Sequence, residues 1–314
     1  MRWRRAHRGK KPVLSDGRVV PDFNEEYLLY QTLVGTLPFD FSQPARRDEY
    51  IERIRQYMEK AVHEAKVNLS WVNDNPEYLE GLRRFIAAIL DPRTPRRSNP
   101  FPQQLEQFVA GIAYPAALNS LAQVVLKITS PGMPDIYRGT ELWDFSLVDP
   151  DNRRRVDFEL RQRLLLELDS RLGHDLVAFC DDLVRTYRDG RIKLWTTLRA
   201  LRFRREHAQL FQNGSYAPLA GAVEKQEHLV AFARFTERDL AIVAVPRLSH
   251  TLGRTSTTSN GSPWGKAELV LPPQAAAARL VNVFTGEELR AGSSRTVLCA
   301  DLFAHFPVAL LELT

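Results

Sequence analysis

The segment PGMPDIYRGTELWDFSLVDPDNRR, residues 131–154, follows the apolar run VVLKITS of residues 124–130. The run is short, rich in β-branched residues and closed by a proline, a pattern typical of a buried parallel strand that opens into a loop. The loop gathers prolines, glycines, aspartates and a tryptophan in one short stretch. Loops held by a rigid scaffold often carry function. We therefore expect a buried strand at 124–130 and a functional loop behind it.

The segments around this loop differ in their hydrophobic period. Apolar residues recur with helical spacing in most of the chain up to residue 207. The predicted helices are 24–35, 46–67, 76–90, 103–123, 158–172, 174–187 and 192–207. Strand patterns then appear in 228–248, 266–272, 278–289 and 307–314, and 249–265 is expected to be a long, mobile loop. The change of period predicts a small antiparallel β domain behind a boundary near residue 215.

The predicted strand at 124–130 has no earlier strand in this chain to pair with. The backbone groups of a single parallel strand cannot satisfy one another. Either the β domain supplies the neighbouring strands, or the chain is the last part of a larger barrel.

Composition and charge exclude several classes of protein. The 314 residues are 44% hydrophobic and 26% charged, as in ordinary globular chains. No uninterrupted apolar run approaches the roughly 20 residues of a membrane span, and the N-terminal residues lack an apolar signal core, so we expect a cytoplasmic protein. Cys180 and Cys299 lack zinc or redox spacing, and the seven histidines form no metal-binding motif. We expect neither a metal nor a cofactor.

The net charge of +5 raises the question of nucleic-acid binding. Acidic residues are interspersed with the basic ones, and no recognition motif accompanies the basic N-terminus. We expect no nucleic-acid partner and no membrane partner.

Several motifs carry a resemblance to a known family. The run PGMPDIYRGTE of residues 131–141 resembles the motif of the eighth strand in the α-amylase superfamily, glycoside hydrolase family 13. NEEYLLYQTLVG, EAKVNLSWVNDN, LWDFSLVDPDNRRRVDF and DGRIKLWTTLRALRFRRE resemble maltooligosyltrehalose synthases in order and spacing. The resemblance covers most of residues 21–210 and is weaker beyond them. Arg155 departs from it, because the family tends to have proline there.

The resemblance implies a fold in three segments. Residues 1–120 would form a mainly helical insertion subdomain, and 121–215 the end of a (β/α)8 barrel with strand eight, the active-site loop and the closing helices. Residues 216–314 would form a C-terminal antiparallel β-sandwich domain. The chain would thus be α/β plus all-β.

The resemblance also implies an isomerase. The family converts the reducing-end α-1,4 bond of a maltooligosaccharide into an α,α-1,1 bond, as in trehalose, by intramolecular transglucosylation without a cofactor. Such chemistry needs a nucleophilic and an acid/base carboxylate about 5 Å apart. In the superfamily these residues and a third aspartate follow strands four, five and seven. None of the three has a matching position in this chain, so we expect no catalytic residue here and no activity of the chain alone.

The remaining site residues are expected to bind substrate or to brace the loop. Stacking and hydroxyl hydrogen bonds predict substrate contacts for a first group of side chains. This group is Asp135, Tyr137, Glu141, Trp143, Lys66 and Trp71. Asp149 and Asp151 are expected to brace the loop against Arg153 and Arg154, as aspartates do in turns.

Three readings of function follow. The first is the C-terminal part of a maltooligosyltrehalose synthase, as a truncated product, one half of a split enzyme or an excised fragment. The second is a non-catalytic α-glucan-binding or complementing module that docks on an N-terminal barrel part. The third is a basic interaction protein with salt-sensitive binding to polyanions.

Overall fold

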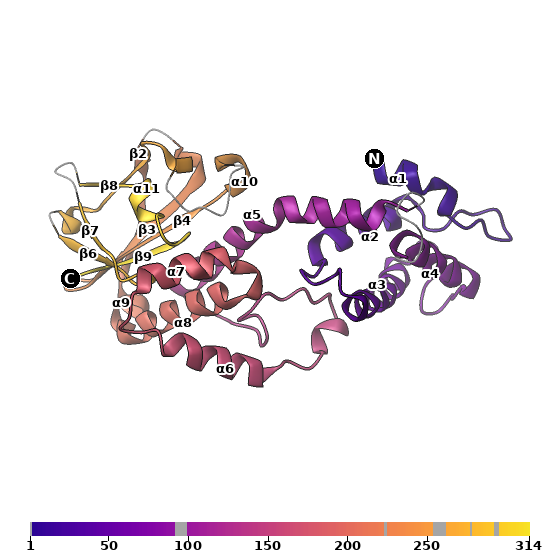
Figure 1. Cartoon of the computed structure of the whole chain (residues 1–314), viewed down its shortest axis with the longest axis horizontal. Helices are drawn as coiled ribbons and strands as arrows, with labels where there is room; N and C mark the ends of the chain where they lie inside the picture. Colours follow the sequence, from indigo (N-terminus) through magenta and orange to yellow (C-terminus); the bar gives the residue numbers. More distant parts are fainter. Residues whose placement is uncertain (1, 92–98, 223–224, 254–261, 277, 292–294) are drawn as a thin grey trace. The chain divides into compact units, whose positions relative to one another are not determined.

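The computed structural model describes residues 2–91, 99–222, 225–253, 262–276, 278–291 and 295–314. The chain forms two compact units (Figure 1). Unit 1 consists of Met1–Gly111 and Phe145–Arg155, and unit 2 consists of Ile112–Asp144 and Val156–Thr314. The 131–154 loop therefore contributes its first part to unit 2 and its second part to unit 1.

Unit 1 is helical. Its elements are α1 (Arg2–His7), η1 (Arg8–Lys10), α2 (Phe23–Thr36), α3 (Pro44–Ala65), α4 (Pro76–Leu90), the first part of α5 (Phe101–Thr129) and the 3-10 turn η2 (Asp151–Arg153). Helix α2 begins with a capping box, in which the Asp22 carboxylate accepts from the Glu25 N–H and the Glu25 carboxylate accepts from the Asp22 N–H. Asn75 caps α4, and Pro76 occupies its first turn, where no N–H is needed. The structure thus confirms the helices predicted at 24–35, 46–67 and 76–90, which are α2, α3 and α4.

The core of unit 1 is made by the apolar stripes of its helices. The α3 stripe predicted from the sequence, Ile51, Ile54, Met58 and Val62, is at most 9% exposed. Helices α2 and α4 pack on α3. The buried α4 side chains include Leu79, Leu82, Phe85, Ile86 and Ile89. Each side chain of this kind stabilises the fold by about 1.5–3 kcal/mol when it leaves water, so the packing of the stripes determines where these helices lie.

The predicted strand at 124–130 is wrong, because helix α5 continues through it to Thr129. Over residues 121–130 of α5, the buried residues are 121, 122, 124, 125, 128 and 129, while Gln123 and Lys127 face solvent. That spacing is helical, and it was hidden by the β-branched composition of the run. A helix also satisfies its own backbone groups, and within the described residues no strand pairs with this run.

Helix α5 is long and apolar enough to cross a membrane by length and composition alone. Its mean hydropathy is 1.5 over an 18-residue window, of which 39% is buried. Counting uninterrupted apolar runs in the sequence missed this window, because isolated polar residues interrupt it. Core helices of globular proteins meet the same criterion, so the window by itself does not assign α5 to a membrane.

Unit 2 combines helices with two antiparallel sheets (Figure 1). Its helices are the rest of α5, α6 (Phe158–Asp169), α7 (Leu176–Arg185), η3 (Tyr187–Asp189), α8 (Arg191–Glu206), α9 (Ala208–Asn213), α10 (Ser249–Leu252) and α11 (Cys299–Leu302). Its strands are β1 (Ser215–Leu219), β2 (Gly221–Ala222), β3 (Leu229–Phe235), β4 (Leu240–Pro246), β5 (Glu268–Val270), β6 (Arg279–Asn282), β7 (Glu288–Arg290), β8 (Thr296–Leu298) and β9 (Ala309–Leu313). Three short 3-10 turns complete it, η4 (Gln226–His228), η5 (Ser262–Trp264) and η6 (Pro273–Ala275).

The larger sheet has the order β1-β3-β4-β9-β6-β7 and the smaller one β2-β5-β8, with antiparallel pairing throughout. The predicted antiparallel β region is thus confirmed, and it begins at Ser215. One hydrophobic core takes side chains from both sheets, such as Ile242 of β4 and Leu269 of β5. Of the loop predicted at 249–265, residues 254–261 lie outside the described residues, and α10 and η5 lie at its two ends.

Candidate functional site

The first part of the 131–154 loop lies in unit 2. Arg204 fixes its beginning by donating hydrogen bonds to the carbonyl oxygens of Ile128, at 2.5 Å, and Gly132, at 2.6 Å. Gly132 has a φ of 114°, a conformation that favours glycine. Residues 133–137 then form neither a helix nor a strand, and within the described part of the chain no strand pairs with them. A turn closed by Thr140 N–H and Tyr137 C=O, at 3.2 Å, ends the run.

Exposure alternates along residues 133–137. Met133 is 93% exposed and Tyr137 is 53% exposed. Asp135 between them is also exposed, whereas Pro134 and Ile136 are half-buried. A period of two is the period of a β-strand. The predicted substrate residues Asp135 and Tyr137 are therefore both exposed, at alternate positions of this run.

Glu141, a predicted substrate residue, is held by an ion pair. Arg161 of α6 donates from Nε to the Glu141 carboxylate at 2.9 Å, and from Nη2 to the Gly139 carbonyl at 2.7 Å. Gly139 has a φ of 92° and lies close to Val156, so a side chain there would be strained and crowded. Arg161 thus fixes the turn that follows Tyr137, and its guanidinium neutralises the Glu141 carboxylate.

Trp143, another predicted substrate residue, is fixed by α8 and the turn before it. Its Nε1 donates to the Tyr187 carbonyl at 2.6 Å. Lys193 Nζ lies 5.6 Å from the centroid of the Trp143 ring and donates to the Leu142 carbonyl at 3.2 Å. Gly190 contacts Leu142 so closely that an added Cβ would meet its side chain at 3.3 Å. The indole is therefore held by its N–H, by a cation over the ring and by backbone packing.

Lys193 was not identified from the sequence. Burial lowers the pKa of this side chain to about 8, and the charge of Asp144 opposes that shift. The residue stands in the run IKLWTTLR, whose helical pattern does not reveal that one lysine faces inward toward a loop some 50 residues earlier. A buried lysine with a lowered pKa beside a loop is a common feature of functional sites.

The second part of the loop lies in unit 1, where Asp151 is nearly buried. Arg53 of α3 donates to both carboxylate oxygens, from Nε and Nη2, at 2.8 Å each. The Leu147 N–H donates to the same carboxylate at 2.7 Å, and Arg154 lies 3.1 Å from it. Burial acts to raise the pKa of Asp151, but the hydrogen bonds from Arg53 and Leu147 outweigh it and lower the pKa.

The neighbouring residues of η2 make more exposed contacts. Asp149 forms an ion pair with Arg153, and its carbonyl accepts from Lys60 Nζ at 2.5 Å. Arg154 also reaches Glu49 at 3.3 Å. The contacts of Asp149 and Asp151 thus include Arg153 and Arg154, together with α3 residues that the sequence did not indicate.

Lys66 and Trp71 lie in unit 1, at the end of α3 and just beyond it. Lys66 is the C-cap of α3 and has a φ of 56°, a left-handed conformation. Trp71 is 62% exposed, and its ring stacks on His63 with centroids 4.1 Å apart. The other predicted substrate residues, including Tyr137, belong to unit 2. The predicted set is therefore divided between the two units.

The structure bears on the cysteines and on metal binding as well. Cys180 and Cys299 are both buried, and burial raises their pKa values to about 12 and about 11. Among the described residues, no group of three or more histidine, cysteine, aspartate or glutamate side chains is placed to hold a metal ion. The cysteines act as core side chains, since a thiol with a raised pKa is a poor nucleophile and metal ligand.

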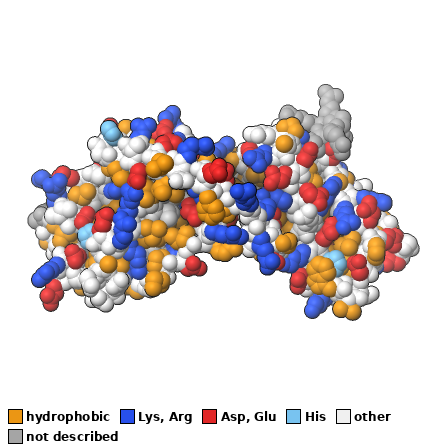
Figure 2. All heavy atoms as spheres, turned by 90° about the horizontal axis from the view of Figure 1, so that it is seen from below, with side chains coloured by type: hydrophobic (Ala, Val, Ile, Leu, Met, Phe, Trp, Pro, Cys, Tyr) orange, Lys and Arg blue, Asp and Glu red, His pale blue; other side chains and the backbone are white. Residues whose placement is uncertain are grey.

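Charged side chains of both signs interleave on the face drawn in Figure 2. Many basic residues are engaged in ion pairs, as Arg202 is with Asp169 at 2.5 Å and Arg191 is with Asp189 at 2.8 Å. Such pairing reduces the local positive potential that polyanion binding requires.

Comparison with known proteins relates the chain to maltooligosyltrehalose synthases. No protein-family model matches it. It is 32% identical over 291 residues to a Mycobacterium tuberculosis protein named as a maltooligosyl trehalose synthase. The matched region covers 93% of this chain and 32% of that protein. The structure of maltooligosyltrehalose synthase from Arthrobacter ramosus matches with a TM-score of 0.72 and 31% identity, over 100% of this chain and 35% of that one.

A Sulfolobus tokodaii structure titled as a hypothetical maltooligosyl trehalose synthase matches with a TM-score of 0.66 and 28% identity, over 100% of this chain and 34% of that one. The chain spans about a third of the length of the curated relatives that it matches. By sequence and by fold, the chain is homologous to a partial region of the maltooligosyltrehalose synthases.

Proposed function

We propose that this chain is the C-terminal part of a maltooligosyltrehalose synthase of glycoside hydrolase family 13, and that it completes the substrate site of that enzyme. The observation that carries this proposal is the match of almost the whole chain to about a third of the relatives, at 32% identity and with a TM-score of 0.72. The intact enzyme would convert the reducing-end α-1,4 bond of a maltooligosaccharide into an α,α-1,1 bond.

The run 133–137 is our proposal for the last strand of the barrel. Its alternating exposure and its lack of a pairing strand within the described residues support this assignment. A strand of this kind needs partners for its backbone groups. We infer that strands of the missing barrel part pair with it, and that Asp135 and Tyr137 then face the saccharide.

The chemistry of the intact enzyme explains why this chain alone would be inactive. One carboxylate attacks the anomeric carbon to form a glycosyl-enzyme, while a second protonates the oxygen of the leaving glucose. The glucose then turns, and its anomeric hydroxyl attacks the glycosyl-enzyme and returns its proton to the second carboxylate. No water is consumed, so the site must hold the glucose and exclude solvent.

The acidic residues of the loop are poor substitutes for these two carboxylates. Glu141 is paired with Arg161, and Asp151 is paired with Arg53 and Arg154. Ion pairs of this kind hold a carboxylate in place and occupy the oxygen lone pairs that attack or proton transfer would use. We assign Glu141 and Asp151 to the positioning of the loop, with Asp149, Arg153 and Arg154 bracing it in unit 1.

Product analysis tests this proposal. The purified chain would be incubated with maltopentaose, alone and together with a separately expressed N-terminal portion of a related synthase. We expect non-reducing, trehalose-ended product only in the mixture. The variant Tyr137→Ala in the mixture should lower kcat/KM by about tenfold or more if the ring contacts the saccharide, with Tyr216→Ala as a matched exposed-tyrosine control. Product from the chain alone would contradict the absence of catalytic carboxylates.

A second candidate function is a non-catalytic α-glucan-binding or complementing module. The observation that favours it is the exposure of aromatic rings in both units, with Trp71 at 62% and Tyr137 at 53%. Exposed rings stack on the apolar faces of sugars and need no catalytic residue. Binding of maltooligosaccharide with no product in any mixture would select this candidate over the first.

A further inference from the structure

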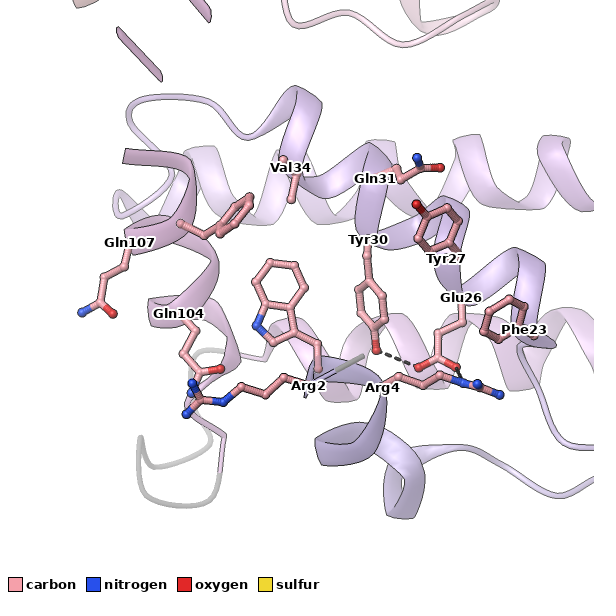
Figure 3. A pocket seen from close by; sticks show the side chains of 12 residues that line it. Arg2, Arg4, Phe23, Glu26, Tyr27, Tyr30, Gln31, Val34, Gln104 and Gln107 are labelled. Carbon is pink, nitrogen blue, oxygen red and sulfur yellow. Dashed lines mark hydrogen bonds and ion pairs between the residues drawn. The ribbon is translucent and has the colours of Figure 1, made fainter. Parts of the chain in front are cut away.

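Unit 1 contains a pocket of about 860 Å³ between α1, α2 and α5 (Figure 3). All of its lining residues belong to unit 1, and it includes no residue of the 131–154 loop. Its volume lies in the range of about 300–1,000 Å³ that is usual for small-molecule sites. The pocket is therefore large enough for a ligand and independent of the site described above.

Aromatic side chains form much of the pocket wall. Trp3 packs edge-on against Tyr30 and Phe108, with ring centroids 5.8 and 5.6 Å apart. Phe23 and Tyr27, one helical turn apart on α2, are stacked with their ring planes 7° apart. Tyr27 is 59% exposed and Phe108 is 50% exposed. Several exposed rings around one hollow form an apolar patch of the kind that marks a binding site.

The ionised side chains that line the pocket are Arg2, Arg4 and Glu26, with a net charge of +1. Glu26 is only 1% exposed, and its carboxylate accepts from Tyr30 Oη at 2.8 Å and from Lys11 Nζ at 2.9 Å. Arg4 lies 3.4 Å from the same carboxylate, and its guanidinium carbon lies 4.3 Å from the centroid of the Phe23 ring. The buried carboxylate is thus compensated by Arg4 and Lys11. Arg2 adds a further guanidinium to the lining, and guanidinium groups donate hydrogen bonds.

Neutral hydrogen-bonding groups complete the lining. Gln31 projects from α2, and Gln104 and Gln107 project from α5, around the rings (Figure 3). Amides both donate and accept hydrogen bonds. A pocket with exposed rings, amide groups and guanidinium donors matches a ligand with apolar faces and hydroxyl edges. Pyranose rings have this chemistry.

We propose that this pocket is a second saccharide-binding site, which holds a linear α-1,4-glucan and shares no lining residue with the 131–154 loop. Sugar rings stack on Tyr27 and Phe108, and their hydroxyl groups bond to the glutamine amides and the exposed side of Arg4. The choice of glucan among neutral saccharides rests on the proposed function, whereas the saccharide chemistry rests on the pocket itself. Such a site increases the local concentration of the polymer near the enzyme.

Isothermal titration calorimetry of the full chain with maltoheptaose tests the proposal. We expect Tyr27→Ala and Gln107→Ala each to weaken binding by about tenfold, because truncation of a contact residue at a ligand site commonly has an effect of this size. Phe158→Ala removes a ring of similar exposure, 59%, from α6 and should leave the affinity unchanged. Circular dichroism of each variant checks that it is folded, and Gln107→Ala, on the surface of α5, guards against a folding defect in Tyr27→Ala.

Two outcomes would overturn the inference. In the first, both pocket variants bind maltoheptaose with wild-type affinity. In the second, both variants bind maltoheptaose normally but lose affinity for the N-terminal portion of a related synthase. The latter would show that the pocket holds a protein segment. The mixture with the N-terminal portion could also fail to form product from maltopentaose while Tyr27-dependent binding of maltoheptaose persists. That result would contradict the proposed function of the chain in catalysis but would still support the saccharide site.

Discussion

At the scale of single residues, Lys193 is the buried charge closest to the first part of the loop. Burial lowers its pKa from 10.5 to about 8, so between these two values the unfolded state binds more protons than the folded state. Its contribution to stability therefore rises with pH across that window, by about 3 kcal/mol in total. We expect Lys193→Met to lose this rise. Urea unfolding at pH 7.5 and 10 measures it, with the exposed Lys266→Met as a control that keeps the wild-type slope.

His7 makes a prediction of the same direction in pH, but in a more acidic range. The residue is 2% exposed, its Nδ1 lies 2.7 Å from the Tyr30 hydroxyl, and burial lowers its pKa to about 4. Between pH 6.5 and 4 the unfolded state binds the extra proton, so wild-type stability falls as the pH drops through that range, by up to about 3 kcal/mol from this group. The difference in the free energy of unfolding between wild type and His7→Gln, measured by urea titration, should therefore shrink as the pH drops from 6.5 to 4. An unchanged difference would contradict the burial of a neutral imidazole, and His250→Asn provides an exposed control.

At the scale of elements, the second part of the loop depends on one ion pair with α3. Asp151→Asn leaves the Arg53 guanidinium, whose side chain is 13% exposed, without its carboxylate partner. Breaking a buried pair in this way should lower the free energy of unfolding by about 3 kcal/mol. Asp149→Asn removes a carboxylate that is 44% exposed and should lower it by less than about 1 kcal/mol. Equal losses in the two variants, by urea unfolding, would mean that Asp151 does not brace the loop.

The same elements show what the sequence can and cannot predict. The capped helix α2 and the apolar stripe of α3 follow from local signals, and both are as predicted. Helix α5 was misread at its end, because β-branched residues in a short window suggested a strand while the exposed Gln123 and Lys127 kept the helical period. The partners of the loop were not predictable, since Arg53 lies 98 residues from Asp151 and only the fold brings them together.

At the scale of the whole molecule, the chain has the helices and antiparallel sheets of a partial synthase region. The motifs around the 131–154 loop indicated the family, because they combine residue types at a fixed spacing. Sequence reasoning divided the chain near residues 120 and 215, whereas the compact units divide within α5 and within the loop. A division into consecutive segments does not describe these units, because residues 145–155 belong to unit 1 although residues 112–144 before them belong to unit 2.

The claim that the chain completes a larger barrel is tested most directly by hydrogen–deuterium exchange of the backbone amides in 133–137. Mass spectrometry would follow the exchange in the chain alone and in its mixture with an N-terminal portion of a related synthase. We predict fast exchange in the chain alone, since its run has no pairing strand within the described residues, and at least about tenfold slower exchange in the mixture. The amides of β4 serve as the protected reference in both samples. Equally fast exchange of 133–137 in a mixture shown to be associated would contradict the account.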